Sequence, residues 1–277
     1  MSASLLATDV ESYHRDGVIG AYQALTSDTV ARFRGALEAF EARMGATLGN
    51  LPGQLRAKTH LLFPWMNELV RNAAVLDAVE SLIGEDILVY HVTCWLKGPG
   101  DGTFVTWHQD GAYFNLQPAE HVTAWIALSD ATEASGCMRF LPGSHLAGAR
   151  EHETGQTDRN LLSNGQQVPG VGDEGAIAVP VPSGYFSLHH THILHASAPN
   201  HGNDRRIGIG VSYIPTHVRF IGDARVTATL VRGEDRFGNF DAEDPPAVEF
   251  DDNARAHHAA TVSRFFAAHG NTRPANA

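Results

Sequence analysis

The stretch RIGIGVSY, residues 206–213, alternates apolar residues with small or polar ones at a period of two. Successive side chains of a β-strand point to opposite faces, so this alternation predicts a strand with one apolar and one mixed face. The mixed face carries a guanidinium beside two glycines, which predicts a hollow next to a positive charge. The apolar face comprises Ile207, Ile209, Val211 and Tyr213, and the mixed face comprises Arg206, Gly208, Gly210 and Ser212.

The same short period extends over the middle of the chain. It runs from about residue 86 to residue 215, and Gly, Pro and Asn interrupt it at intervals of roughly 8–12 residues, which is typical of a barrel or sandwich. Further strands are predicted over residues 87–96, 121–128 and 185–188. Segment 147–175 is rich in Gly, Gln, Asn and Asp and predicts a long surface loop, a feature that is often a lid or a binding loop.

Helical spacing of apolar residues dominates the first third of the chain. Thr8 and Glu11 have the spacing of a capping box and predict the start of a short helix. Gly17 is expected to end it, because glycine readily adopts the left-handed conformation found at helix C-termini. A longer helix is predicted over residues 26–45 and a third over residues 67–83.

The end of the chain combines an acidic, irregular stretch over residues 233–252 with a final amphipathic helix over residues 253–268, closed by Gly270. The sequence shows no internal repeat and no linker, so we expect one domain over residues 1–277. Its predicted parts are a helical layer (1–85), a β core (86–220) and a C-terminal extension with a helix (221–277).

Composition and charge exclude several classes of protein. Hydrophobic residues make up 43% of the chain and charged residues 18%, as expected of a globular protein. The formal net charge of −11 argues against nucleic-acid binding and against an anionic membrane surface. Cys94 and Cys137 are the only cysteines, so a cytoplasmic location is expected. No signal peptide is predicted, because the N-terminal residues lack a basic segment followed by a long apolar core. No membrane span is predicted either, because no apolar run approaches about 20 residues.

Two His-x-Asp triplets occur in the chain, and composition alone gives about two His-x-Asp/Glu matches by chance. His14 and Asp16 fall at the end of a predicted helix, where residues i and i+2 point about 200° apart and cannot share a ligand. His108 and Asp110 fall at the end of a predicted strand, where residues i and i+2 project to the same face. Only the second pair is therefore expected to converge on one metal ion.

A histidine-rich segment offers candidates for a further ligand, namely His189, His190, His192 and His195. The last of these precedes a turn over residues 199–204, after which the strand of Arg206 begins. If the two segments form a hairpin, His195 and Arg206 lie close together on adjacent strands. The fork of an arginine side chain binds a small carboxylate through two parallel hydrogen bonds.

Two histidines and one carboxylate on one side of an ion, next to a carboxylate-binding arginine, are typical of the facial triad of non-haem Fe(II) oxygenases. The three remaining coordination positions suit a 2-oxo acid, which takes two of them, and O2, which takes the third. The residues therefore predict an iron site.

Three segments of the chain resemble the phytanoyl-CoA dioxygenase family of Fe(II)/2-oxoglutarate-dependent oxygenases. They are WHQDGAYF (107–114), VTAWIALSDATEASGCMRFLPGSH (122–145) and LHASAPNHGNDRR (194–206). The N-terminal segment 11–34 is similar to the opening helices of the family, so the resemblance covers most of the chain. It implies a fold that is mainly β with flanking helices: a double-stranded β-helix, also described as a cupin-like jelly roll, with an N-terminal helical layer.

The resemblance also implies roles for individual residues. His108, Asp110 and His195 would bind Fe(II). Arg206 would bind the distal carboxylate of 2-oxoglutarate; parity alone does not choose between it and Arg205, and the spacing in the family favours Arg206. Further contacts to 2-oxoglutarate would come from Ser197, Thr123 and Trp125.

The implied activity is hydroxylation of an unactivated C–H bond, with 2-oxoglutarate and O2 as cosubstrates and succinate and CO2 as products. Related halogenases replace the carboxylate ligand by a small residue, so the presence of Asp110 disfavours halogenation. Desaturation, epoxidation or demethylation by the same fold, and a non-catalytic cupin-like metal-binding protein, are the alternatives. The acidic chain favours a small polar or cationic metabolite over an acyl-CoA, whose phosphates would require basic residues. The sequence does not indicate the oligomeric state.

Several neighbouring residues have less specific predictions. Candidates for substrate contact are Gln109, Trp107 and Tyr113, together with Phe114. Histidines such as His189, His190 and His192 are more often satisfied polar residues than catalytic groups. Lys97 precedes a Gly-Pro-Gly turn, from which it could reach the active site, but a solvated loop lysine is the prediction.

Overall fold

The larger of the two main β-sheets has seven strands in the computed structural model, which describes residues 4–155, 158–162 and 165–269. In spatial order they are β1 (Val18–Gln23), β8 (Tyr185–His190), β5 (Val122–Ala127), β10 (Arg206–Pro215), β2 (Ile87–Lys97), β12 (Thr227–Arg232) and β13 (Asp241–Ala242). Neighbours are antiparallel except for β12 and β13. The four predicted strands are present as β2, β5, β8 and β10, and the sheet extends beyond the predicted β core because β1 and β12 also join it.

The smaller sheet has four strands, which in spatial order are β3 (Val105–His108), β9 (His195–Ser197), β6 (Met138–Phe140) and β7 (Ile177–Val179). A separate pair consists of β11 (Arg219–Phe220) and β4 (Leu116–Gln117). β9 and β10 belong to different sheets, so the predicted hairpin between His195 and Arg206 is wrong. The turn over residues 199–204 instead crosses from one sheet to the other.

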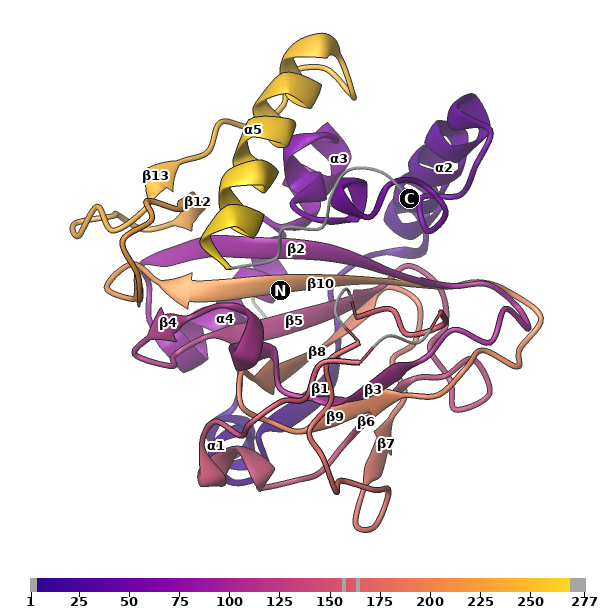
Figure 1. Ribbon diagram of the computed structural model, residues 1–277, viewed down its shortest axis with the longest axis vertical. Coiled ribbons are helices and arrows are strands. Elements are labelled where there is room, and N and C mark those ends of the chain that lie inside the picture. Colours follow the sequence, from indigo (N-terminus) through magenta and orange to yellow (C-terminus); the bar gives the residue numbers. More distant parts are fainter. Residues whose placement is uncertain (1–3, 156–157, 163–164, 270–277) are drawn as a thin grey trace.

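The helices lie mostly outside the larger sheet (Figure 1). They are α1 (Ala7–Asp16), α2 (Ser27–Met44), α3 (Pro64–Leu69), α4 (Ala73–Ile83) and α5 (Asp252–Ala268). Short 3-10 turns are η1 (Gly53–Arg56), η2 (Thr59–Leu61), η3 (Asp110–Tyr113) and η4 (Ser144–Ala147). The prediction of a mainly β fold with flanking helices is confirmed. Gly270, the predicted terminator of the last helix, lies outside the described residues.

Two predicted helix boundaries differ from the structure. The first helix begins after Leu6 rather than at Thr8, because the Asp9 carboxylate accepts a hydrogen bond from the Leu6 N–H at 3.1 Å. The third predicted helix is two helices, α3 and α4. The side-chain oxygen of Asn72 accepts from the Val75 N–H at 3.2 Å and starts the second of them, so an internal cap divides one apolar pattern.

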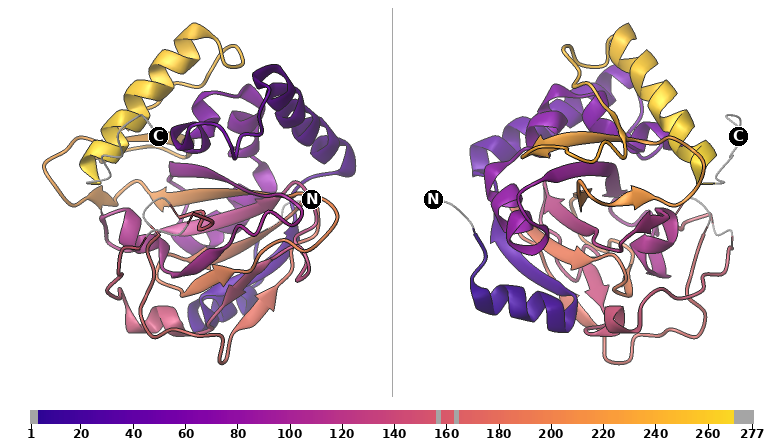
Figure 2. Two further views of the ribbon diagram at one scale, coloured as in Figure 1. Left: turned by 45° about the vertical axis from the view of Figure 1, so that its right-hand side comes forward. Right: turned by 90° about the vertical axis from the view of Figure 1, so that its left-hand side faces the viewer.

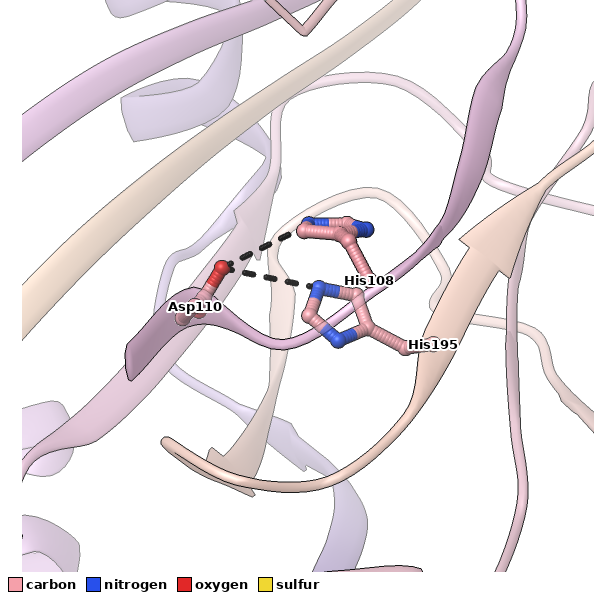
Figure 3. A group of neighbouring side chains, drawn as sticks. All are labelled: His108, Asp110 and His195. Carbon is pink, nitrogen blue, oxygen red and sulfur yellow. Dashed lines mark ion pairs between the residues drawn. The ribbon is translucent and has the colours of Figure 1, made fainter. Parts of the chain in front are cut away.

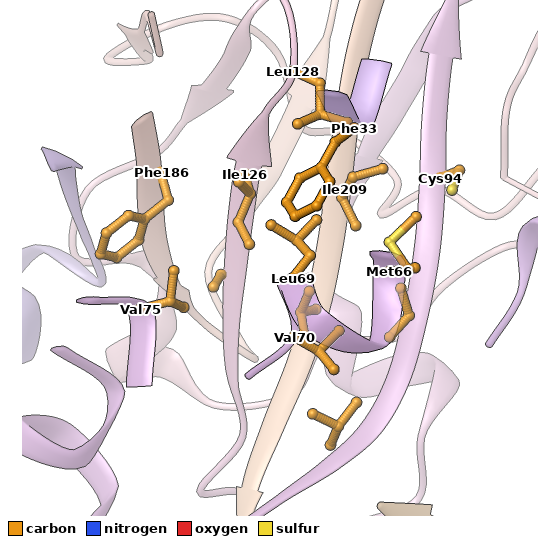
Figure 4. Packing of buried hydrophobic residues seen from close by; sticks show 14 of the residues in the cluster. Phe33, Met66, Leu69, Val70, Val75, Cys94, Ile126, Leu128, Phe186 and Ile209 are labelled. Carbon is orange, nitrogen blue, oxygen red and sulfur yellow. The ribbon is translucent and has the colours of Figure 1, made fainter. Parts of the chain in front are cut away.

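The main hydrophobic core lies between the helices and one face of the larger sheet. Phe33 of α2 and Met66 and Leu69 of α3 pack there with Ile126 of β5 and Ile209 of β10 (Figure 4). Fully burying a side chain of this kind contributes about 1.5–3 kcal/mol to folding. The apolar face of β10 is buried in this core as predicted, so its opposite face is turned toward the smaller sheet.

The glycine-bearing face of β10 accommodates two indole rings. A Cβ atom at Gly208 would lie 1.9 Å from a ring carbon of Trp125, and one at Gly210 would lie 2.9 Å from Nε1 of Trp95. The hollow expected from the glycines is therefore occupied largely by tryptophan. Only a smaller space remains beside Arg206.

The predicted long loop is present, since the described residues between η4 and β7 form only turns, bends and isolated bridges. In both views of Figure 2, α5 lies above the sheets and α1 lies below them. None of the described helices has the length and apolarity needed to cross a membrane.

Candidate metal centre

His108 and His195 face each other across two neighbouring strands of the smaller sheet. They are paired in the register of β3 and β9, and their ring centroids are 4.0 Å apart. Asp110 lies at the start of η3 and directs its carboxylate toward both rings (Figure 3). Each histidine Nε2 atom lies 3.6 Å from Oδ1 of Asp110. The structure thus brings together the three predicted iron ligands.

Backbone hydrogen bonds fix which nitrogen of each imidazole faces Asp110. Nδ1 of His108 donates to the carbonyl of Thr106 at 2.9 Å, and Nδ1 of His195 donates to the carbonyl of Ile193 at 3.1 Å. A neutral ring that carries its proton on Nδ1 has a lone pair on Nε2, which is the form that binds a metal. Both rings therefore present lone pairs toward the same point.

The second carboxylate oxygen of Asp110 is held by other side chains. Oδ2 accepts hydrogen bonds from Oγ1 of Thr123 at 2.7 Å and from Nε2 of His189 at 3.1 Å. Because Thr123 gives its proton to Asp110, its oxygen accepts from Nε2 of His121 at 3.1 Å. These contacts leave Oδ1 directed at the two facing histidines.

A close backbone approach after Asp110 requires a glycine. The Gly111 N–H donates to the carbonyl of Thr191 at 2.9 Å, and a Cβ atom at Gly111 would lie only 2.7 Å from the His192 ring. This contact joins η3 to the connection between β8 and β9. The Asp-Gly sequence therefore positions the carboxylate as well as supplying it.

Electrostatics suit a metal-binding group. Burial opposes the negative charge of Asp110, but the imidazoles of His195, His108 and His189 together hold its pKa well below the usual range. Burial, and then the neighbouring His108, keep the pKa of His195 well below 6.5, so this ring is neutral. The ligand atoms of the triad all lie within 4.8 Å of one another and could hold a metal ion.

A cavity of about 30 Å³, termed the Arg206 cavity, adjoins the triad between the two sheets. Besides the triad it is bounded by Thr123 and Trp125 of β5, Ser197 of β9 and Arg206 of β10. All the predicted 2-oxoglutarate contacts therefore line one space, although the hydroxyl of Thr123 is already bonded to the Asp110 carboxylate.

Arg206 is a buried cation with unused hydrogen-bonding capacity. Its side chain is 1% exposed, Nη1 donates to the carbonyl of Gly136 at 2.7 Å, and Nε has no hydrogen-bond partner. Burial lowers its pKa to about 10, which leaves it charged at neutral pH. Among the described residues no carboxylate forms an ion pair with Arg206, whereas Arg205 pairs with Glu41. An anionic ligand such as the distal carboxylate of 2-oxoglutarate fits this environment.

Lys97 is fully buried, so the prediction of a solvated loop lysine is wrong. β2 extends through Lys97, which is paired with Arg206 in the register of β2 and β10. Its Nζ donates to Oγ of Ser197 at 2.7 Å and to the carbonyl of Ala198 at 2.5 Å. Burial, and then the charge of Arg206, lower its pKa to about 6. Lys97 therefore orients the Ser197 hydroxyl at the edge of the Arg206 cavity.

Gln109 does not occupy the substrate position predicted for it. Its side-chain amide donates to the carbonyls of His192 at 2.6 Å and Gly148 at 3.0 Å and accepts from the Arg150 N–H at 2.7 Å. The side chain is 1% exposed and joins the long loop to the strand connection. Its polar atoms are therefore used by the backbone.

The two aromatic candidates lie on different sides of the centre. Trp107 alternates with His108 along β3 and points away from it, because its Nε1 donates to Asp173 at 3.2 Å and its ring packs with Val168. The predicted substrate contact by Trp107 is thus not supported. Tyr113 lines a second cavity that also reaches the triad.

His121 was not singled out in the sequence, and His189 was named there only as one of several candidate ligands. His189 lies opposite Thr123 in the register of β8 and β5, and strand parity would have placed it near the triad if the predicted strand had continued past residue 188. His121 shares its parity with Thr123, but nothing in the sequence shows that their side chains would bond.

The model of the phytanoyl-CoA dioxygenase (PhyH) family matches residues 13–208, which include the triad and Arg206. The chain belongs to this family. Family membership accounts for most of the described elements, since the match begins in α1 and ends in β10.

Curated relatives share parts of this family domain. The protein named "Probable alpha-ketoglutarate-dependent hypophosphite dioxygenase" from Stutzerimonas stutzeri is 32% identical over 157 residues, which cover 56% of this chain and 54% of the relative. L-proline trans-4-hydroxylase from Streptomyces griseoviridis is 26% identical over 236 residues, which cover 77% of this chain and 87% of that enzyme. The chain spans about half the length of several curated relatives that it matches.

Solved structures give the fold. The non-heme monooxygenase ThoJ in its apo form is 30% identical, with a TM-score of 0.83 and coverage of 95% of this chain and 98% of that one. CytC3 with Fe(II) and alpha-ketoglutarate is 19% identical with a TM-score of 0.67, covers 91% and 97%, and supports the fold alone. The expected double-stranded β-helix is confirmed. The chain thus has the fold and the family of the Fe(II)/2-oxoglutarate-dependent oxygenases, and its His/Asp/His group suits Fe(II).

Proposed function

We propose that this phytanoyl-CoA dioxygenase family member hydroxylates an unactivated C–H bond of a small polar metabolite. The observation that carries the proposal is the convergence of His108, Asp110 and His195 beside Arg206, a buried cation without a carboxylate partner among the described residues. Fe(II) with 2-oxoglutarate and O2 supplies the oxidising chemistry. One oxygen atom of O2 enters the product hydroxyl and the other enters succinate, with release of CO2.

The residues of the chain have distinct tasks in this proposal. The imidazoles of His108 and His195 and Oδ1 of Asp110 would hold the iron, and the remaining coordination positions would be available to the cosubstrates. Arg206 binds the distal carboxylate of 2-oxoglutarate, and Ser197 and Trp125 limit the space around it. Thr123 acts through Asp110, whose second oxygen it holds.

Hydroxylation of a small metabolite agrees with the names of several relatives. These relatives include proteins named for hypophosphite, L-proline and ectoine, which are all small molecules. The fold alone does not fix the outcome, since structures described as an epimerase and a carbocyclase share it with TM-scores of 0.59 and 0.63. The carboxylate at Asp110 supports transfer of a hydroxyl group over transfer of a halide.

Anaerobic titration with Fe(II) and then 2-oxoglutarate tests the proposal. We expect the weak visible charge-transfer band of an Fe(II) chelated by a 2-oxo acid, followed by succinate formation when O2 is admitted. Asp110→Ala removes a ligand and a charge and should abolish both signals. Asp16→Ala changes the exposed His-x-Asp triplet of α1 and should leave both unchanged.

The outcomes separate the alternatives. A metal-binding protein without oxygen chemistry would form no such band and no succinate. Full succinate formation by Asp110→Ala would rule out the assignment of the triad. Product analysis distinguishes hydroxylation, which adds one oxygen atom, from desaturation, which removes two hydrogen atoms, and from demethylation. An epoxide also gains one oxygen atom and requires a structural assignment of the product.

A further inference from the structure

A second cavity, termed the Arg56 cavity, also opens on the candidate metal centre. Its volume is about 120 Å³, and it shares His108, Asp110 and Trp95 with the Arg206 cavity. An engineered cavity of about 150 Å³ in another protein binds benzene, which has six heavy atoms, so this somewhat smaller space suits a body of about that size. A molecule held here lies next to the metal.

Aromatic and aliphatic side chains form much of its wall. Phe265 and Phe266 come from α5, Leu162 comes from the long loop, and Phe114 follows η3. Ligand pockets lined in this way bind an apolar body, while a few polar groups fix its orientation. The wall therefore favours a substrate with an apolar part beside its polar group.

Arg56, at the end of η1, carries the only fixed positive charge among the described residues that line this cavity. The next residue is tied to two elements of the fold. Ala57 forms an isolated bridge with Thr93 of β2, and its carbonyl accepts from Nε2 of His258 of α5 at 2.8 Å. The partly buried Arg56 is therefore attached to a frame that includes the sheet and the last helix.

Two polar groups of the wall have no hydrogen-bond partners. Nδ1 of His91 is one of them, and this ring is stacked on Phe265 with centroids 4.5 Å apart. The Tyr113 hydroxyl is the other. Buried polar atoms without partners cost free energy, so a ligand that reaches them after a small side-chain rotation is favoured.

The charges in the cavity argue against a cationic ligand. Asp110 is the only carboxylate among the described lining residues, and its two oxygens are directed at the histidines of the centre and at Thr123. A cation would have only aromatic faces to bind and would be repelled by Arg56. The net charge of −11 favoured a cation, but distant surface charges are screened beyond about 10 Å and the local guanidinium is not.

We infer that the substrate carries an oxyanion group, a carboxylate or a phosphonate, which Arg56 binds, on an apolar body that lies against the aromatic wall of the Arg56 cavity. This inference rests on the proposed function, because it assigns the substrate of the same centre. Arginine binds both groups through paired, charge-assisted hydrogen bonds. The anion would thus anchor one part of the substrate while the apolar part lies in the space shared with the metal ligands.

Matched probes test this inference by calorimetric titration of the anaerobic protein loaded with Fe(II) and 2-oxoglutarate. They share a phenylalkyl body and differ in the polar group: 3-phenylpropanoate, 2-phenylethylphosphonate, the neutral 3-phenylpropanamide and the cationic 3-phenylpropylamine. We expect at least one anion to bind about tenfold or more tightly than the amide. The tighter of the two anions identifies whether the carboxylate or the phosphonate is the natural group.

Variants assign the preference to Arg56. Arg56→Gln should reduce the affinity of the anion to that of the amide and should leave the affinity of the amide unchanged. Arg56→Lys should retain part of the preference for the anion over the amide. Arg32→Gln removes an exposed arginine paired with Glu68 and should leave the preference intact. The inference would be overturned if the anions and the amide bound equally well, if the amine bound more tightly, or if no probe bound. It would also be overturned if the preference for the anion survived in Arg56→Gln.

The charge-transfer band separates failure of this inference from failure of the proposed function. Arg56 contributes no atom to the triad, so the band should form in Arg56→Gln as in the wild type and thereby also report a folded centre. If the wild type forms no band, the proposed function fails. If the band is normal but the probes are not discriminated, only the substrate class is wrong.

Discussion

The two cavities that meet at His108 and Asp110 are built in different ways. The Arg206 cavity lies between the sheets and is lined mainly by strand residues, whose positions follow from backbone register. The Arg56 cavity takes much of its wall from η1, η3, the long loop and α5, which are placed by packing between segments distant in sequence. The rigid sheets thus hold the residues for the shared cosubstrate, and the substrate side is assigned to segments that vary more easily.

Loss of Arg206 should break the first cavity without affecting the second, and we expect the largest effect here. Arg206→Met removes the buried guanidinium while keeping an apolar side chain in its place. Losing one partner of a buried charge pair costs 2–5 kcal/mol, so the affinity for 2-oxoglutarate should fall by about a hundredfold. Titration of the charge-transfer band with 2-oxoglutarate measures the change.

The neighbouring arginine supplies the matched control. Arg205→Met removes an ion pair with Glu41 and should lower stability, but the affinity for 2-oxoglutarate should stay within about twofold of the wild type, because Arg205 does not line the cavity. Equal losses in the two variants would contradict the assignment of Arg206. Probe binding in the Arg56 cavity should be similar in all three proteins when 2-oxoglutarate is saturating.

The contrast between the cavities also explains what the sequence could predict. The alternation of apolar and small or polar residues along β10 predicted which face is buried in the core and which faces the site. The i, i+2 spacing of His108 and Asp110 identified two candidate ligands that the structure places together. Parity applied to Trp107 would also have shown that it points away from His108. These residues were predictable because an extended backbone determines the direction of each side chain, and the chain stays extended from β3 through Gln109.

Other features depend on contacts between segments far apart in the sequence. The chain crosses between sheets after Ser197, so no hairpin forms, and nothing local in the turn distinguishes the two outcomes. Lys97 is buried because a strand of the other sheet ends against it. Arg56 joins the metal centre only through the docking of η1 on β2 and α5. Such placements follow from tertiary packing and leave no periodic signal in the sequence.

Gly208→Ala should damage the wall of the Arg206 cavity. The added methyl group would lie 1.9 Å from the Trp125 ring, so the indole must move or the strands must separate. Overpacking of this kind costs about 1–3 kcal/mol, and the affinity for 2-oxoglutarate should fall together with stability. Gly35→Ala, on α2 with no atom within 4 Å of the new methyl group, should instead raise stability by roughly 0.5–1 kcal/mol. Chemical denaturation compares the two variants, and equal stability of Gly208→Ala and the wild type would contradict the packing argument.

His189→Leu should affect the ligands that the two cavities share. His189 donates to Oδ2 of Asp110, and loss of an outer partner of a metal ligand typically lowers metal affinity by about ten- to a hundredfold. We expect the lower end, about tenfold, because Thr123 still holds the same oxygen. His190→Leu is the control, since the His190 ring packs against His145 and not against the triad. A competitive titration with Fe(II) measures both, and unchanged affinity in His189→Leu would show that Thr123 alone positions Asp110.

Replacing Lys97 should change the pH dependence of stability, and we expect this effect to be the smallest of the four predicted here. Burial and Arg206 lower the pKa of Lys97 to about 6, whereas the amine of the unfolded chain titrates near its usual 10.5. Between these values the unfolded chain binds a proton that the folded protein does not, so this group makes the free energy of unfolding rise with pH, by at most about 1.4 kcal/mol per pH unit. Lys97→Met should flatten that rise between pH 7 and pH 9, as measured by chemical denaturation.

Lys58, the other lysine, has the Glu243 carboxylate as its partner, so Lys58→Met should lower stability throughout this range instead. If Lys97→Met keeps the slope of the wild type, the amine is protonated in the folded protein, and two adjacent cations rather than one would face the carboxylate of 2-oxoglutarate.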